Sequence, residues 1–171
     1  MSNKMCVAIL TLSVIGASAW IALADENEAS GAAVAKFLPT AKVTLQQGLA
    51  AAESQGQPIS GKFEVDEGHF QLSVYTAQAG KFSEVLVDYN SGKIAKSEAI
   101  TGGDDLADAR KQMEACAKAK KPLKSAVDEA EKAAAGYRAV SVTPTLKSGH
   151  VVALVTLLKG TQVKSVSETL E

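Results

Sequence analysis

The chain of 171 residues has few aromatic residues, cysteines and histidines, and each shortage narrows what the protein can be. Phe, Trp and Tyr make up only 5% of the residues, so a core has to be built from Val, Leu and Ala. Two cysteines, Cys6 and Cys116, cannot define a disulfide framework. A formal net charge of −1 gives no reason to expect nucleic acid or an anionic membrane as a partner. With 46% hydrophobic and 22% charged residues, the chain should still fold.

The two histidines, His69 and His150, each lie beside a glycine of a predicted hairpin turn. A zinc site needs three or four protein ligands, and the sequence offers no third histidine or nearby cysteine to join them. We therefore expect exposed turn residues, with no metal and no cofactor. The sequence also lacks the motifs of zinc proteases, serine hydrolases and nucleotide-binding enzymes. These observations predict a protein that is not an enzyme.

Residues 1–24 have the pattern of an export signal. Lys4 gives a basic start, residues 6–15 an apolar run, and Ala22-Leu23-Ala24 a small-x-small cleavage site. Residues 5–24 as a whole are twenty mostly apolar residues, about as many as span a bilayer, so an uncleaved anchor is the alternative. We predict cleavage after Ala24 and a periplasmic or secreted protein, which meets the membrane only if the signal is kept.

Residues 63–96 show period-two alternation, broken by turns that contain glycine. In Phe70-Gln71-Leu72-Ser73-Val74, for example, every second side chain is apolar. This pattern is typical of an antiparallel meander with one face in water. Three more strands are predicted over residues 139–146, 150–158 and 161–169.

Helices are predicted ahead of each set of strands. Thr44 and Gln47 can form a capping box, in which each side chain satisfies a backbone N–H of the other residue. Apolar residues recur at helical spacing from Leu106 to Cys116, which predicts a buried, inert thiol. Pro122 suits the first turn of a further helix, so we expect two helices that meet there rather than one kinked helix.

The second half of the chain repeats the first. The turn Glu67-Gly68-His69-Phe70 matches Ser148-Gly149-His150-Val151, and each half has a helix that ends at a glycine. Matched positions, such as Glu67 and Ser148, differ in residue number by a constant amount. We call this constant difference the repeat shift. Such self-similarity indicates two copies of one unit. A unit of about 50 residues is marginal alone, so the two copies should share a core. We predict an α+β protein of two tandem units, each a helix packed on a three- to four-stranded antiparallel meander.

The last turn of the first meander reads Val87-Asp88-Tyr89-Asn90-Ser91-Gly92-Lys93-Ile94. Together with the capping box, it resembles the PepSY domain (peptidase propeptide and YpeB type), which ends in a similar V-D-x-x-(T/S)-G-K element. The residues that carry this resemblance are Val87, Asp88, Gly92 and Lys93. The resemblance covers roughly residues 42–97, with a degenerate copy over 121–171. It implies a non-catalytic module that acts in protease precursors as an inhibitory or folding-assisting propeptide.

These elements predict five segments. They are a signal peptide (1–24), an N-terminal segment (25–43), a first PepSY-like unit (44–101), a linking helix (102–121) and a second, degenerate PepSY-like unit (122–171). Asp88 and Lys93 have two interpretations, either a recognition tip or charges that keep the ends of the strands soluble around a turn set by Asn90-Ser91-Gly92.

The central strand of the second unit is apolar on both faces. Val152, Leu154 and Leu158 occupy the face that carries Gln71, Ser73 and Tyr75 in the first unit. A strand with two apolar faces is normally covered on both, and one helix covers only one of them. We expect the three residues to pack on the first unit, on a second copy of the chain or on a partner.

The sequence therefore predicts an exported, non-catalytic PepSY-like binding protein. Its expected partner is a protein, either a peptidase or another envelope protein that it contacts or regulates, or a second copy of itself. The alternative is a periplasmic carrier that binds a small ligand between the two units.

Overall fold

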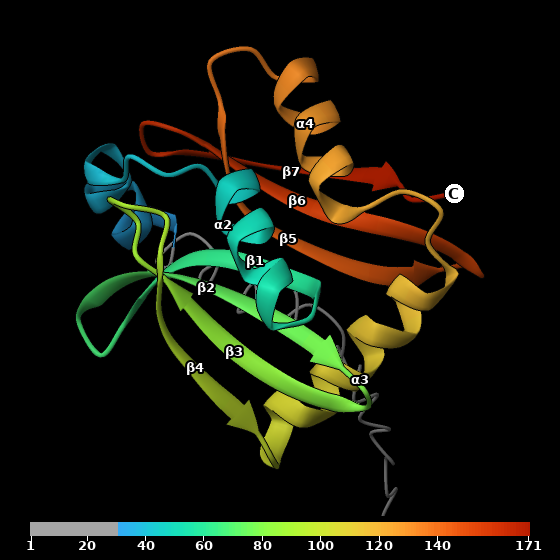
Figure 1. The fold of residues 1–171 in the computed structure, drawn as a ribbon. Coiled ribbons are helices and arrows are strands. Elements are labelled where there is room, and N and C mark those ends of the chain that lie inside the picture. Colours follow the sequence, from blue (N-terminus) through green and yellow to red (C-terminus); the bar gives the residue numbers. More distant parts are fainter. Residues whose placement is uncertain (1–30) are drawn as a thin grey trace, which may run out of the picture.

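The computed structural model describes residues 31–171, whose strands all join one antiparallel sheet (Figure 1). The strands are β1 (Gln57–Asp66), β2 (His69–Gln78), β3 (Lys81–Val87), β4 (Ile94–Ile100), β5 (Arg138–Lys147), β6 (His150–Lys159) and β7 (Gln162–Thr169). Their order across the sheet is β4-β3-β2-β1-β5-β6-β7. The chain thus runs outward from β1 to the β4 edge, returns beside β1, and runs outward again to the β7 edge. The predicted α+β class is confirmed.

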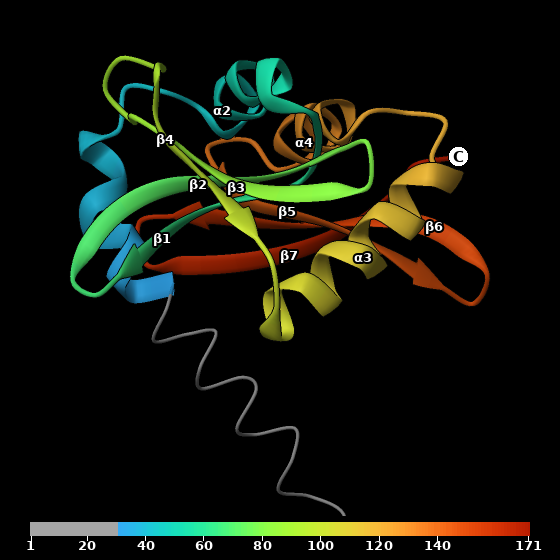
Figure 2. The same ribbon diagram turned by 60° about the horizontal axis from the view of Figure 1, so that its bottom comes forward.

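Helices lie on both faces of the sheet. Residues 31–37 are helical and continue into the 3-10 turn η1 (Leu38–Thr40). The others are α2 (Leu45–Ala52), the 3-10 turn η2 (Glu53–Gln55), α3 (Gly103–Lys118) and α4 (Leu123–Ala133). Figure 2 shows α2 and α4 side by side on one face, with α3 crossing the other. None of the helices within residues 31–171 is both long and apolar enough to cross a bilayer.

The predicted export signal, residues 1–24, lies outside the described residues, and so does its cleavage site after Ala24. Of the N-terminal segment 25–43, the structure describes the part from residue 31 onward.

Helix α2 begins as its sequence predicts. Thr44 Oγ1 accepts the backbone N–H of Gln47 at 3.2 Å, and the backbone N–H of Thr44 donates to Oε1 of Gln47 at 2.9 Å. The predicted capping box is therefore confirmed. Gly48 faces the sheet, where a Cβ atom would lie 2.5 Å from Cδ2 of the buried Leu72. The glycine weakens the helix but lets it approach the sheet closely.

The chain breaks between α3 and α4 at Pro122. The backbone N–H groups of Lys120 and Lys121 donate to the carbonyl oxygen of Leu170, at 2.6 and 3.1 Å, and Pro122 is the N-cap of α4. The prediction of two separate helices is confirmed. Cys116 on α3 is only 7% exposed, and burial raises the pKa of its thiol to about 11.

The core lies between the sheet and the helix pair α2 and α4. The fully buried side chains at its centre are Leu45, Leu72, Val74, Val127, Val142 and Val155. Each contributes about 1.5–3 kcal/mol relative to an exposed position, so this layer is a main source of stability.

The hairpins β1–β2 and β5–β6 share the same irregularities. The pairing register shifts between Pro58 and Ser60 in the first hairpin and between Ala139 and Ser141 in the second. Each turn has a non-glycine residue and then a glycine with positive φ. These turn residues are Glu67, Gly68, Ser148 and Gly149. Each of these positions in the first hairpin corresponds to one in the second by the repeat shift. The two hairpins therefore share the same backbone irregularities at equivalent positions.

A short pairing between β1 and β5 joins the hairpins into one sheet, which the sequence did not predict. Gly61 lies opposite Val142, and Lys62 lies opposite Ser141. Since β1 and β5 are antiparallel, the β1–β2 and β5–β6 turns lie at opposite ends of the sheet (Figure 1).

Candidate binding surfaces

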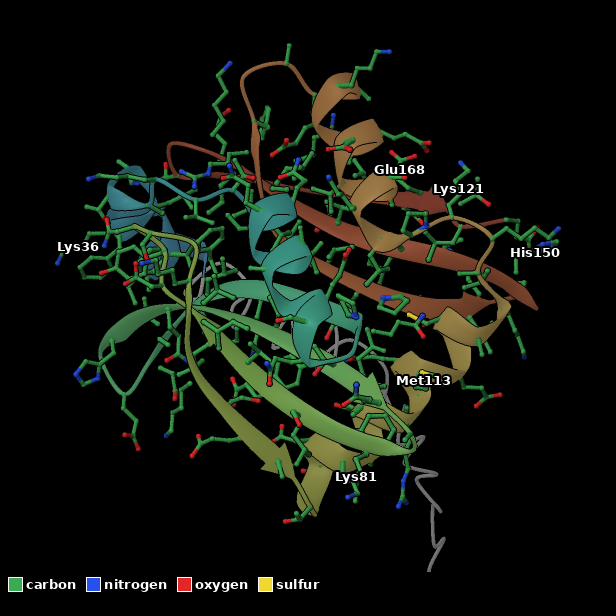
Figure 3. The ribbon with its side chains drawn as sticks, viewed as in Figure 1. Lys36, Lys81, Met113, Lys121, His150 and Glu168 are labelled. Carbon is green, nitrogen blue, oxygen red and sulfur yellow. The ribbon has the colours of Figure 1, made fainter. Side chains whose placement is uncertain are left out.

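The two histidines lie at opposite ends of the sheet, because each belongs to one of these turns. Both are exposed. Figure 3 shows His150 at the outer end of its hairpin, where Nδ1 lies 3.1 Å from both carboxylate oxygens of Glu171. His69 and His150 therefore do not face one site. Within residues 31–171, no three His, Cys, Asp or Glu side chains gather as a metal site would require.

The family-like turn after β3 is held by its own residues. The Asp88 carboxylate accepts the backbone N–H of Ser91 at 2.6 Å and that of Asn90 at 3.2 Å. Hydrogen bonding from Ser91 lowers the pKa of Asp88. Gly92 has a φ of 73°, which favours glycine, and its N–H donates to the Asp88 carbonyl at 2.8 Å. Val87 is buried, whereas Lys93 is exposed. This geometry favours a structural role for Asp88 and Gly92.

The turn also anchors the segment that leads into α2. The backbone N–H groups of Lys42 and Val43 both donate to the carbonyl oxygen of Tyr89, at 2.9 and 3.0 Å. Arg138, at the start of β5, donates to the carbonyl oxygens of Leu38, Ala41 and Val43, at 3.0, 3.1 and 2.6 Å. The segment is therefore tied to both halves of the sheet.

The predicted surface residues Val152, Leu154 and Leu158 differ in exposure. Leu158 is 2% exposed, and it lies near Gly31 at the start of the N-terminal helical residues. Leu154 is 44% exposed, and Val152 is half-buried. The N-terminal segment thus adjoins one end of this strand, and α3 crosses the same face and contacts β5 and β6, so the exposed part lies around Leu154 and along β7. Leu158 belongs to the core of the chain itself.

Leu154 lies at the centre of a surface of three by three positions on β5, β6 and β7, which we call the hydroxyl face. Its members are Ser141, Thr143, Thr145, Val152, Leu154, Thr156, Ser165, Ser167 and Thr169. Thr143 and Ser167 flank Leu154 directly across the strands. None of these side chains is charged. Among its hydroxyl groups, only that of Thr169 has a hydrogen-bond partner within residues 31–171, the N–H of Glu171.

The equivalent surface on β1, β2 and β3, one repeat shift earlier in the chain, is charged. Its positions are Ser60, Lys62, Glu64, Gln71, Ser73, Tyr75, Glu84, Leu86 and Asp88. Lys62 forms an ion pair with Glu64 at 2.5 Å, and Ser73 donates to the same carboxylate at 2.7 Å. Ser60 donates to Gln112 of α3 at 2.7 Å. We call this surface the charged face.

The charged face is largely satisfied by its own residues and by α3. Burial raises the pKa of Tyr75 to about 12. Burial alone would lower the pKa of Lys62, but the hydrogen bond and the charge of Glu64 outweigh it and raise that pKa. The polar groups of the charged face are thus largely engaged, whereas most hydroxyls of the hydroxyl face have no hydrogen-bond partner in the described part of the chain.

Comparison of the chain with protein-family models, curated proteins and solved structures found no match. Function therefore has to be inferred from the residues themselves. The sequence prediction identified Leu154 and Val152 but missed the surrounding hydroxyls, because alternating Ser and Thr look like ordinary water-facing positions. The signal that could have revealed the hydroxyl face is a comparison of the two halves. Every charged residue of the charged face is matched, one repeat shift later, by an uncharged residue of the hydroxyl face.

Proposed function

We propose that the protein is an exported, non-catalytic binding protein built from two PepSY-like units, and that its hydroxyl face binds a separate protein such as a peptidase or another envelope protein. The observation that carries this proposal is the contrast between the two faces. One face is charged and largely satisfied by internal contacts. The other is uncharged and exposes a leucine at its centre, and most of its hydroxyls form no hydrogen bond within residues 31–171.

Two features support two related units. The register shifts and the turn residues recur at the same repeat shift as the sequence itself. In addition, α2 makes most of its sheet contacts with β1, β2 and β3, and α4 makes most of its own with β5, β6 and β7, while each also contacts the innermost strand of the other half, β5 or β1. The resemblance to PepSY rests on the first unit, where Asp88 and Gly92 build the turn that the family element would require.

The composition of the hydroxyl face suits contact with another protein. Interface cores are depleted in charged residues, and their apolar anchors are surrounded by polar groups that can be satisfied. Leu154 supplies an apolar anchor, and the hydroxyls beside it can donate or accept. A charged partner surface is disfavoured, because no opposite charge lies on the hydroxyl face to compensate its desolvation.

The hydroxyl face is the centre of such an interface and not its full extent. Its three strands span about 10 Å and its length along them about 14 Å. A stable interface covers about 800 Å² on each partner, several times this area. The partner must therefore reach beyond the hydroxyl face, and the nearest exposed surface is the rest of β7, which is an edge strand of the sheet.

The test is capture of a partner from an envelope extract with three forms of the protein. Wild type should retain a protein that Leu154→Asp loses, because a buried carboxylate in an apolar contact is costly. The matched control is Leu146→Asp. Leu146 is 37% exposed but lies at the end of β5, outside the hydroxyl face. This variant should retain the partner.

Two results would contradict the proposal. In one, Leu154→Asp retains every protein that wild type retains. In the other, wild type is a dimer that Leu154→Asp converts to monomers, which would assign the hydroxyl face to contact between two copies. Sedimentation of the three forms distinguishes these cases, and the melting temperature checks that the variants are folded.

A further inference from the structure

A second candidate site lies away from the hydroxyl face, between the two halves of the chain. It is a cavity of about 420 Å³ bounded by the end of α2, η2, the start of β1 and the connection between α3 and α4. This volume is within the range of small-molecule sites in proteins. Figure 3 marks its position through Lys121, which lies on that connection.

The inner wall of the cavity is apolar. Leu49, Leu123 and Cys116 line it and are almost fully buried, and the half-buried Pro58 completes this wall. Burial raises the pKa of the Cys116 thiol to about 11, so this wall carries no charge at neutral pH. An apolar group of a ligand would displace water from this wall, which favours binding.

The mouth of the cavity is basic. Lys120, Lys121 and Lys124 line it, against a single carboxylate, that of Glu53. Lys121 is paired with Glu129 at 3.3 Å, outside the lining. Glu171 has a lowered pKa, chiefly because of its hydrogen bond with His150, and Lys120 contributes a smaller part of that shift. Neither Lys120 nor Lys124 forms an ion pair within 4.0 Å among residues 31–171, so both can face an anionic group.

We infer that this cavity binds a monocarboxylate with an apolar chain, held with the chain against Leu49 and Leu123 and the carboxylate beside Lys120 and Lys124. Two independent features combine in this assignment, the apolar inner wall and the excess of ammonium groups at the mouth. The charge of the ligand is set by the mouth, because Lys120 and Lys124 outnumber the one carboxylate that lines it, Glu53, and this excess favours an anion. This site is independent of the hydroxyl face and of any protein partner.

The experiment is calorimetric titration of the full chain with octanoate and with 1-octanol, which has the same chain length but no charge. We expect octanoate to bind at least tenfold more tightly than octanol. In Lys120→Glu/Lys124→Glu the octanoate affinity should fall at least tenfold, while octanol binding should change less than twofold. The control Lys111→Glu/Lys118→Glu makes the same change of net charge on α3, at residues that do not line the cavity. It should bind octanoate as wild type does.

A further variant tests the location. Ala119→Trp places an indole in the cavity and should weaken both ligands, and circular dichroism and the melting temperature must show that the variant is folded. The inference is wrong if wild type binds no octanoate, if octanol binds as tightly, or if the control double variant loses as much affinity as the cavity variant.

Discussion

Replacing Gly48 with alanine should have opposite effects on stability depending on the residue at position 72. Alanine improves helix propensity by about 1 kcal/mol over glycine. In the native structure, however, the new Cβ atom would lie 2.5 Å from Cδ2 and 3.1 Å from Cγ of Leu72, which is fully buried. Overpacking of this kind costs about 1–3 kcal/mol. We therefore expect Gly48→Ala to lower the free energy of unfolding by up to about 2 kcal/mol, the difference between these two effects.

The sign should reverse in a Leu72→Ala background. That substitution costs about 2–5 kcal/mol by itself, because it leaves a cavity under α2. With the leucine side chain gone, nothing opposes the gain in helix propensity, and the added methyl group fills part of the cavity. Gly48→Ala should then stabilise the protein by about 1 kcal/mol.

Urea unfolding of all four proteins, followed by circular dichroism, gives the required double-mutant cycle. The reasoning would be refuted if Gly48→Ala stabilised wild type as much as it stabilises the Leu72→Ala variant. That result would mean that α2 does not approach β2 as closely as the structure shows.

Two further predictions concern the half-buried Arg138 and the buried Cys116. Arg138→Lys should lower the free energy of unfolding by about 2–3 kcal/mol, because lysine cannot reach all three carbonyl oxygens that Arg138 binds. Urea unfolding measures this change, and the control Arg110→Lys, at an exposed position, should show almost none. Equal effects of the two substitutions would contradict the role of Arg138 in holding these carbonyl groups. Because the pKa of Cys116 rises from 9.0 to about 11 on folding, the folded chain binds more protons than the unfolded chain between these values, and the contribution of the thiol to stability should be lost as pH rises through this window. Urea midpoints measured across this window should fall more steeply for wild type than for Cys116→Ala, and parallel curves would show that the thiol is not buried.

The local elements of the fold could be predicted from the sequence where one physical signal dominated. The capping box at Thr44 and the break at Pro122 are set by backbone chemistry within a few residues, and both are found as predicted. The first strand is longer than predicted. Alternation begins at Phe63, but β1 begins at Gln57, because the register shift after Pro58 and the glycine at 61 interrupt the pattern. At Gly61 the strand lies under α2, where a Cβ atom would be 3.1 Å from Leu49 Cδ2.

The arrangement of these elements depends on contacts that local patterns do not encode. The pairing of β1 with β5 involves residues from the two halves of the chain and is fixed by only two residue pairs. Helix α3 lies on the face opposite α2 (Figure 2) and contacts strands of both halves, β1, β2, β5 and β6. Leu158 was predicted to share one surface with Leu154. It is buried because the chain before η1 passes this end of β6, which its own strand pattern could not reveal.

The measurement that tests the central claim most directly is photo-crosslinking at two equivalent positions. A benzoylphenylalanine is placed at Ser165 on the hydroxyl face or at Glu84, its counterpart one repeat shift earlier on the charged face. Each position lies on the strand that pairs with the middle strand of its half, although β7 is an edge strand and β3 also pairs with β4. After irradiation in the envelope, Ser165 should give a crosslink to a second protein and Glu84 should not. A crosslink from Glu84 with none from Ser165, or no crosslink from either, would contradict the proposal.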